Sequence, residues 1–475
     1  MRNILPICFV LMLLMVVAVA CGDDDDDNDD GAKDDDATDD DSSDDDSVDD
    51  DAIDDDAVDD DTTDDDTGDD DVIDDDTVDD DTVDDDTGDD DTVDDDTADD
   101  DTYIEDADYV VVGAATHEET VEPLLAYHAG QGMNAWFKDT ESILVEYEGE
   151  DIQAKIRTYL QSLLDDTRTQ YALLVGSHQM LPMRLLHHDP DDHREYQTYS
   201  DLYYSDLGGD MNADGDQYYG EWGEDEYDWT PEMYVGRLPF DDPATLANLV
   251  DKIVNWSVDD PDYKWDALLA AGTIQIPGDS AIIMQMINNW VVEPAGLLSW
   301  RMYQLNGWLW PDQLLNHDSF IERWSTNQTG FVMWACHGSK TCAFADDAFF
   351  CNTDAPELGD DEPSVVFSTA CSNGSLEDPA GLTPSLLTNG AVNVIASTDV
   401  THPGDVGEAS LVFLVMVDHT LVQNTPFAVG LGIAKERYMN LYFPWHFYDT
   451  GLYLRNFFGF NLYGDPAMRY WHELP

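Results

Sequence analysis

The chain has 475 residues, enough for two or three domains or for one large domain with extensions. Its 107 acidic and 18 basic residues give a formal net charge of −89; residues 21–100 hold 48 of the acidic ones, and residues 101–475 keep 59 acidic against 16 basic residues, since Arg2 and Lys33 lie outside. A surface this acidic argues against binding nucleic acid or anionic lipid through a basic face.

Residues 1–20 predict a secretory signal peptide. Arg2 precedes a long apolar run that ends in small residues. The run closes on "AVAC", followed by Gly22, and this resembles the lipobox of bacterial lipoproteins, although Ala18 stands where Leu, Val or Ile is usual. The resemblance implies that Cys21 is lipidated and anchors an exported protein at the bacterial outer membrane or cell surface. Cleavage without lipidation would give a freely secreted protein instead.

Residues 21–102 hold the candidate lipidated cysteine and then a low-complexity segment in five-residue steps such as "DDDTVDDDTV". Such a segment buries no apolar surface and repels itself, so we expect a disordered, extended linker. The simplest interpretation is a solvated stalk that lifts a domain away from a membrane. Loose Ca²⁺ binding or surface adhesion is the alternative.

From Tyr103 onward, short apolar runs alternate with helical patterns. The strand-like runs include "DYVVVGA", "YALLVGS", "DALLAAGTI", "GFVMWACHGS", "SVVFSTACSNG" and "GAVNVIAST". This alternation, with continuously apolar strands, predicts an α/β fold around a mainly parallel sheet. An Asp-, Tyr- and Gly-rich stretch at about 177–232 lacks the rhythm. We therefore predict two subdomains, an N-terminal α/β subdomain at 103–240 and a C-terminal one at 241–475.

Within the stretch that lacks the rhythm, "DMNADGDQYYGE" fits the pattern D-x-[DN]-x-[DN]-G-x5-E in full. Gly215 permits the sharp turn that such a loop needs, and no flanking helices are evident. We predict a structural Ca²⁺ site outside an EF-hand; an Asp-rich turn is the alternative interpretation. The predicted ligands are the side chains of Asp210, Asn212 and Asp214, the backbone carbonyl of Asp216 and the carboxylate of Glu221.

Two of the later strand-like runs end in reactive residues. His337 follows the first and Cys371 the second, 34 residues further on. That spacing allows a crossover between neighbouring parallel strands, so both side chains would project from the same edge of the sheet. A thiol beside a base is the arrangement that nucleophilic catalysis requires. Taken singly, a strand-end cysteine is more often inert core, and a His-Gly is commonly a turn.

Four cysteines fall between residues 336 and 371, without the paired spacing of a structural zinc site. An oxidising compartment would permit one disulfide, for which Cys342 and Cys351 are the best pair. At least one thiol then remains free.

The same residues resemble gingipain-type cysteine peptidases, relatives of the caspases. "HGS" at 337–339 and "ACSNG" at 370–374 match the family's two catalytic segments. The likeness extends over about residues 108–470 and includes "YALLVGSHQMLPMR", "PEMYVGRLP" and "NLYGDPAM". It implies a caspase-like α/β/α sandwich and a cysteine endopeptidase that acts on protein or peptide substrates.

The resemblance also implies roles for individual residues. Cys371 would attack the scissile carbonyl, His337 would protonate the leaving amine, and the backbone N–H groups of Gly338 and Cys371 would hold the oxyanion. Asp279 lies near the place where basic-specific members keep an aspartate at the base of the specificity pocket.

The chain departs from the family at several places. Cys336 replaces the glycine that usually precedes the histidine, and the run "LLAAGTIQIPGD" offers no glutamate to orient the imidazole, so we predict a dyad. Two other functions stay open at this stage. One is a catalytically inactive binding lipoprotein that keeps the peptidase fold, and the other is a transpeptidase that processes exported proteins.

Overall fold

The structure, a computed structural model, describes residues 108–166, 168–188, 196–275, 278–305, 309–327, 329–402, 409–443 and 450–472. The predicted signal peptide, Cys21 and the Asp-rich linker lie outside these residues. Among the helices that the structure describes, none combines the length and the apolar character needed to cross a membrane.

A single large sheet forms the core of the described residues. Its eleven strands there follow the order β2-β1-β3-β6-β16-β15-β14-β10-β7-β8-β9, and the pairs are parallel except for β15 with β16. The strands are β1 (Asp108–Gly113), β2 (Ala135–Asp139), β3 (Thr169–Val175), β6 (Tyr234–Leu238), β7 (Asp266–Ala271), β8 (Leu298–Tyr303), β9 (Gln313–Leu314), β10 (Phe331–Ala335), β14 (Ser364–Ser368), β15 (Ala391–Ser397) and β16 (Phe460–Tyr463).

The apolar runs of the sequence become the inner strands of this sheet. Every residue of β1, β10, β14 and β15 is buried, as expected for parallel strands covered on both faces. Helices connect the strands, and they account for the 3.6-residue patterns between the apolar runs. These helices are α2 (Glu118–Gly130), α3 (Thr140–Glu146), α4 (Ile152–Asp166), α6 (Pro243–Val258), α7 (Asp279–Ile287), α8 (His317–Thr326), α9 (Leu382–Thr388), α10 (Ala409–Leu421), α11 (Phe427–Tyr442) and α12 (Thr450–Gly459). The predicted α/β fold with a mainly parallel sheet is confirmed.

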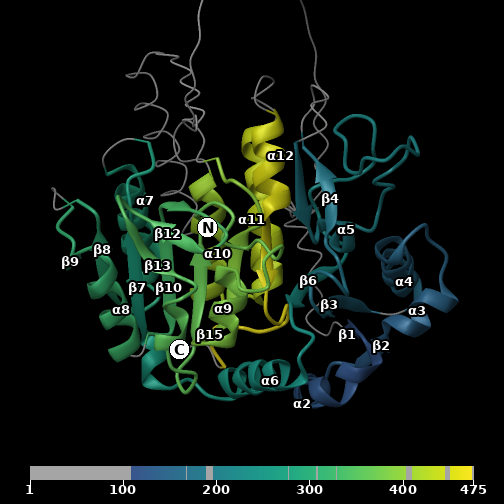
Figure 1. Cartoon of the computed structure of the whole chain (residues 1–475), viewed down its shortest axis with the longest axis horizontal. Coiled ribbons are helices and arrows are strands. Elements are labelled where there is room, and N and C mark those ends of the chain that lie inside the picture. Colours follow the sequence, from purple (N-terminus) through teal and green to yellow (C-terminus); the bar gives the residue numbers. More distant parts are fainter. Residues whose placement is uncertain are drawn as a thin grey trace, which may run out of the picture. The chain divides into compact units, whose positions relative to one another are not determined.

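The two predicted subdomains supply opposite ends of the same sheet. Strands of residues 103–240 lie at one end and most strands of residues 241–475 at the other, with α6 running between them (Figure 1). The junction is β16, which pairs with β6 on one side and with β15 on the other. Just after β16, the fully buried Asp465 accepts hydrogen bonds from Tyr109 Oη (3.0 Å) and His128 Nε2 (2.8 Å). The residues that follow β16 are thus tied to β1 and α2.

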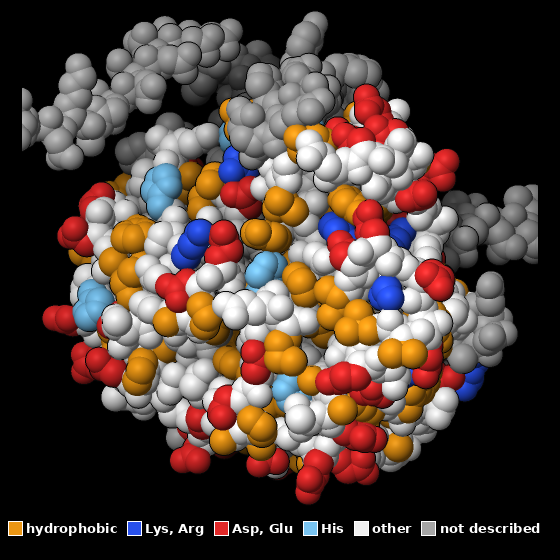
Figure 2. All heavy atoms as spheres, turned by 45° about the vertical axis from the view of Figure 1, so that its right-hand side comes forward, with side chains coloured by type: hydrophobic (Ala, Val, Ile, Leu, Met, Phe, Trp, Pro, Cys, Tyr) orange, Lys and Arg blue, Asp and Glu red, His pale blue; other side chains and the backbone are white. Residues whose placement is uncertain are grey.

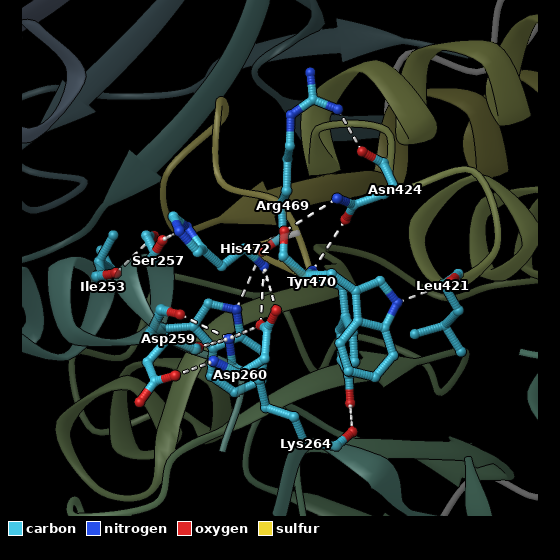
Figure 3. Close-up of polar contacts among 12 residues, drawn as sticks. Ile253, Ser257, Asp259, Asp260, Lys264, Leu421, Asn424, Arg469, Tyr470 and His472 are labelled. Carbon is cyan, nitrogen blue, oxygen red and sulfur yellow. Dashed lines mark hydrogen bonds and ion pairs between the residues drawn. The ribbon is translucent and has the colours of Figure 1, made fainter. Parts of the chain in front are cut away.

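The C-terminal residues also close over the turn that follows α6 (Figure 3). The backbone N–H of His472 donates to the carboxylate of Asp260, at 2.8 and 3.0 Å. Lys264, whose side chain is fully buried, donates to the same carboxylate (3.0 Å) and to the carbonyls of Trp256 and Asp259. Burial lowers the pKa of Lys264, and its contact with Asp260 opposes that shift. These contacts fix residues 469–472 against α6 although more than 200 residues separate them in sequence.

The stretch without regular rhythm lies outside the large sheet but belongs to the same compact unit. It contains an antiparallel pair, β4 (Arg184–His187) with β5 (Gln197–Ser200), the short α5 (Leu202–Ser205) and the Asp210–Glu221 loop. Arg237 of β6 holds this region through two hydrogen bonds to Asp201 (2.9 and 2.6 Å). Figure 2 shows Asp and Glu side chains scattered over the described part of the face in view, where they outnumber Lys and Arg.

Candidate active site

Cys371 lies just beyond the carboxyl end of β14, in a turn with an unusual backbone. The next residue, Ser372, has φ of 56°, a left-handed conformation that few non-glycine residues adopt. Its N–H donates to the carbonyl of Asp399 (2.8 Å), which holds this turn in place. The Cys371 thiol is half-buried, and its Sγ lies 3.6 Å from Thr401 Oγ1 and 3.8 Å from the Thr401 carbonyl. A strained turn at a strand end is typical of functional sites.

His337 opens a small hairpin that leaves β10, and its side chain is exposed. The hairpin sheet comprises β11 (His337–Gly338), β12 (Cys342–Phe344) and β13 (Ala348–Cys351). His337 Nε2 lies 3.1 Å from the carbonyl of Ile274. A carbonyl only accepts, so this contact places the proton of a neutral imidazole on Nε2 and leaves Nδ1 as the basic nitrogen. The Ile274 carbonyl thus orients the ring in a chain that lacks the family's glutamate.

The two strand ends meet at one edge of the sheet. β10 and β14 are parallel neighbours, with Trp334 opposite Ser368, so the loops that follow leave side by side. Gly338 packs directly against the Cys371 turn: a Cβ at position 338 would lie 2.4 Å from the Cys371 carbonyl oxygen and 2.8 Å from its nitrogen. A residue with a side chain does not fit there. The predicted proximity of the His337 and Cys371 loops is therefore present.

The N–H of Cys371 is directed to no acceptor among the described residues. Gly338, whose N–H is the other predicted oxyanion donor, lies opposite Ala343 in the register of the hairpin.

The carboxylate of Asp279 is engaged in backbone hydrogen bonds. Asp279 is the first residue of α7, and its carboxylate accepts the N–H groups of Ile274 (3.1 Å), Gln275 (2.7 Å) and Ser280 (2.7 Å). These contacts fix the turn whose Ile274 carbonyl faces His337. The role of Asp279 in the specificity pocket stays a prediction. The observed contacts instead fix the position of the Ile274 carbonyl, which in turn contacts His337.

Thr401, which touches the Cys371 sulfur, belongs to a loop held by two separate parts of the chain. Asp399 in this loop accepts two hydrogen bonds from Arg455 of α12 (3.1 and 3.0 Å) and one from Thr198 of β5 (2.8 Å). Burial raises the pKa of Asp399, but the hydrogen bonds from Arg455 and other donors outweigh it, so the pKa is lowered. Sequence reasoning missed Arg455 and Thr198, because nothing local marks either residue as a neighbour of the thiol.

The other cysteines have structural positions. Cys342 and Cys351 form the predicted disulfide, which joins β12 to β13 in the hairpin that begins at His337. Cys336 is 3% exposed, and burial raises the pKa of its thiol well above the usual value. Thiolate is the reactive form of cysteine, so Cys336 is inert and Cys371 is the accessible one of the two free thiols in the described residues.

The Asp210–Glu221 loop forms a tight turn, with Gly215 at φ of 75°. Asp214 and Glu221 come together with Glu224, their carboxylate oxygens lying within 4.8 Å of one another. Sequence reasoning missed Glu224, which lies three residues beyond the motif. The carboxylates of Asp210, Asp214 and Asp216 each accept a backbone N–H group, that of Asn212 (3.0 Å), Asp216 (3.1 Å) and Tyr218 (2.6 Å) respectively. The Asp216 carbonyl, a predicted ligand, accepts a hydrogen bond from the Asn212 amide (3.2 Å).

Two oxygens in this loop have features of metal ligands. Asn212 Oδ1 and Glu221 Oε2 are buried, and neither has a hydrogen-bond partner among the described residues. Burial, with repulsion from Asp216, Glu224 and other acids, raises the pKa of Glu221 to about 7. Oxygen donors of this kind suit Ca²⁺, which would satisfy both orphan atoms and offset the repulsion.

A thiol and an imidazole on neighbouring strand ends of such a sheet define the caspase-like class of cysteine peptidases. The sequence profile of Peptidase family C25 matches residues 102–471, and the chain belongs to this family.

Solved structures with the same fold include gingipain R, described as an Arg-specific cysteine proteinase. It is 17% identical, with a TM-score of 0.60, and the match covers 77% of this chain and 78% of that one. The complex of the RgpB pro- and mature domains from Porphyromonas gingivalis gives 17% identity and a TM-score of 0.60, over 76% and 79% of the two chains. A structure described simply as a protease gives 16% identity and 0.61, over 77% and 79%. No curated protein matches the chain.

Proposed function

We propose that the protein is an active cysteine endopeptidase with Cys371 as nucleophile and His337 as acid and base. The observation that carries the proposal is the contact of Gly338 with the Cys371 backbone, which brings the two strand-end loops together. The buried, inert environment of Cys336 supports the same assignment, because it leaves Cys371 as the accessible free thiol among the described residues.

The reaction follows from the groups present. Nδ1 of His337 takes the proton of Cys371 Sγ, and the thiolate attacks the carbonyl carbon of the scissile peptide. The N–H groups of Cys371 and Gly338 stabilise the oxyanion, a contribution worth about 3–4 kcal/mol per donor in comparable sites. His337 then gives its proton to the leaving amine. In the second half, His337 takes a proton from water, the hydroxide attacks the thioester, and the thiol leaves with that proton.

The proposal is tested by alkylation of the folded protein. Iodoacetamide at neutral pH should modify Cys371 alone, and loss of casein hydrolysis should follow the modified fraction one to one. Peptide mapping by mass spectrometry identifies the modified thiol. Hydrolysis that persists after complete modification of Cys371 would contradict the proposal. Product masses in the presence of an added amine distinguish hydrolysis from transfer to that amine.

We also propose that the protein is exported and anchored through Cys21, an inference that rests on the sequence of residues 1–22. A bacterial host grown with labelled palmitate should incorporate label into the wild-type chain, and Cys21→Ser should remove it. An unlabelled wild-type chain that is recovered from the medium would support simple secretion instead.

We propose that the loop around Asp214, Glu221 and Glu224 binds a structural Ca²⁺. Two buried oxygens without partners support this, on Asn212 and Glu221. Ca²⁺ at 100 times its dissociation constant should raise the free energy of unfolding by about 2.7 kcal/mol, and EGTA should reverse the effect. Glu221→Gln should abolish the response, whereas Glu226→Gln, at an exposed site in the same segment, should preserve it. An equal response in both variants would argue against the site.

The pH dependence has a definite sign. The pKa of Glu221 is raised to about 7 from an ordinary value of 4.5. Between these values and without metal, the folded protein holds this proton more tightly than the unfolded chain does, so the free energy of unfolding falls as the pH rises. Ca²⁺ requires the carboxylate, so its stabilising effect should be complete above pH 7 and decline as the pH falls below it. Thermal melts with and without Ca²⁺ between pH 5 and 8 measure this difference. A Ca²⁺ effect that is independent of pH would exclude Glu221 as a ligand.

A further inference from the structure

Asn373 connects the loop that carries Cys371 to the hairpin that carries His337. It lies two residues after the cysteine and is 1% exposed. Its amide nitrogen donates to the carbonyls of Ser339 (2.8 Å) and Cys342 (3.1 Å). These carbonyls belong to the two ends of the turn between β11 and β12, because Ser339 N–H also bonds to the Cys342 carbonyl (2.9 Å). The Asn373 side chain thus forms hydrogen bonds to both ends of the turn that follows His337 and Gly338.

The amide oxygen of Asn373 is anchored in the sheet below. It accepts hydrogen bonds from Trp334 Nε1 of β10 (3.1 Å) and from Ser368 Oγ of β14 (2.7 Å). Trp334 and Ser368 face each other in the register of these two strands. The oxygen is therefore fixed by the same two strands whose ends carry His337 and Cys371.

The orientation of the amide follows from its partners. Two carbonyls can only accept and an indole N–H can only donate, so the nitrogen must face the hairpin and the oxygen must face the sheet. The amide uses both of its N–H groups and both acceptor positions of its oxygen. A buried polar network in which every donor and acceptor has a partner is rigid, and leaving one of these groups without a partner lowers the stability of the fold.

We infer that Asn373 is a positioning residue for the reaction, setting the distance and orientation between the Cys371 thiol and the His337 imidazole. The inference rests on the proposed function of the two residues. Asn373 touches neither the sulfur nor the imidazole; it acts through the Ser339–Cys342 turn and through its own chain segment. A base misplaced by about 1 Å lowers catalytic rates on the order of 100-fold.

Asn373→Asp is the sharpest test, because it keeps the shape and replaces both donors by an oxygen that faces two carbonyls. We expect kcat to fall about 100-fold and KM to stay within threefold. We also expect iodoacetamide to alkylate Cys371 at least tenfold more slowly at pH 7, where the thiolate depends on His337, but at the wild-type rate at pH 10.5, where the thiol ionises without help.

Thr383→Val is the matched control. The Thr383 hydroxyl is equally buried and donates to the backbone carbonyl of Asn373 (2.7 Å), so its loss removes one buried hydrogen bond from the same segment without freeing the hairpin. It should lower the melting temperature while leaving kcat and the alkylation rate at pH 7 within threefold of wild type. If Asn373→Asp does not fold, Asn373→Ser, which retains one donor and adds no charge, should show about a tenfold loss in both readouts.

The outcomes separate the two proposals. If the folded Asn373 variant matches Thr383→Val in kcat and in alkylation at pH 7, the positioning role is wrong. If the wild-type protein hydrolyses no peptide, the proposed function fails, yet the alkylation rates still decide whether Asn373 sets the thiol beside the imidazole.

Discussion

Replacing Cys371 by alanine will lower kcat/KM for peptide hydrolysis on the order of 10⁴-fold or more. The substitution removes the proposed nucleophile. The second free thiol in the described residues, Cys336, is buried with a raised pKa and cannot replace it. Initial rates on casein and on short fluorogenic peptides measure the loss. Because Cys371 is half-buried, the free energy of unfolding should change by no more than about 1 kcal/mol.

Cys336→Ala is the control for Cys371→Ala. It also removes a free thiol, one residue before the predicted base, but one that lies under the backbone of Gly272 and away from solvent. Activity should survive at wild-type order of magnitude, while stability falls by about 1–3 kcal/mol through the cavity left behind. The reverse pattern, with activity lost in Cys336→Ala and kept in Cys371→Ala, would exchange the roles of the two thiols.

Gly338→Ala should be the second most damaging substitution. The added methyl group would lie 2.4 Å from the Cys371 carbonyl oxygen and 2.7 Å from Ala370 Cβ, well inside contact distance, so the two loops must separate. Overpacking of this kind costs about 1–3 kcal/mol of stability. A displacement of the histidine from the sulfur should reduce kcat by about 100-fold or more. Kinetic constants and thermal melts of the purified variant measure both effects.

The matched control is Gly359→Ala. A Cβ built at Gly359 meets nothing within 4 Å, and the backbone there is not left-handed. Stability and activity should therefore remain within about 0.5 kcal/mol and twofold of wild type. If Gly338→Ala changes activity and stability as little as Gly359→Ala does, the close packing of the His337 and Cys371 loops is not required for activity.

His337 contacts the backbone carbonyl of Ile274, in a chain for which the sequence predicts no glutamate to orient the imidazole. The backbone carbonyl supplies a fixed acceptor for Nε2, and Asp279 in turn holds the Ile274 turn through three backbone N–H groups. The sequence predicts a dyad from the missing glutamate. It does not predict the contact with the Ile274 carbonyl, because every residue has a backbone carbonyl and the sequence does not show which way that group points.

The Asp210–Glu221 loop, proposed to bind Ca²⁺, shows the same division between local and tertiary information. The motif letters predict the sharp turn at Gly215 and the central acids Asp214 and Glu221, because turn geometry is local. They do not predict Glu224, whose carboxylate joins the cluster only because the chain folds back beyond the motif. Nor do they predict that the carboxylates of Asp210 and Asp216 bind backbone N–H groups.

The sequence by itself determined the α/β class, the strands whose ends carry His337 and Cys371, and the Cys342–Cys351 pair. Each of these depends on residue type and on spacing over a few tens of residues at most. Tertiary structure alone decided that β16 would join the two halves in one sheet and that Thr198 and Arg455 would hold the loop beside the thiol. It also decided that Asn373 would connect the loops that carry His337 and Cys371. These contacts depend on strand order and loop closure between distant segments, which hydrophobic periodicity does not encode.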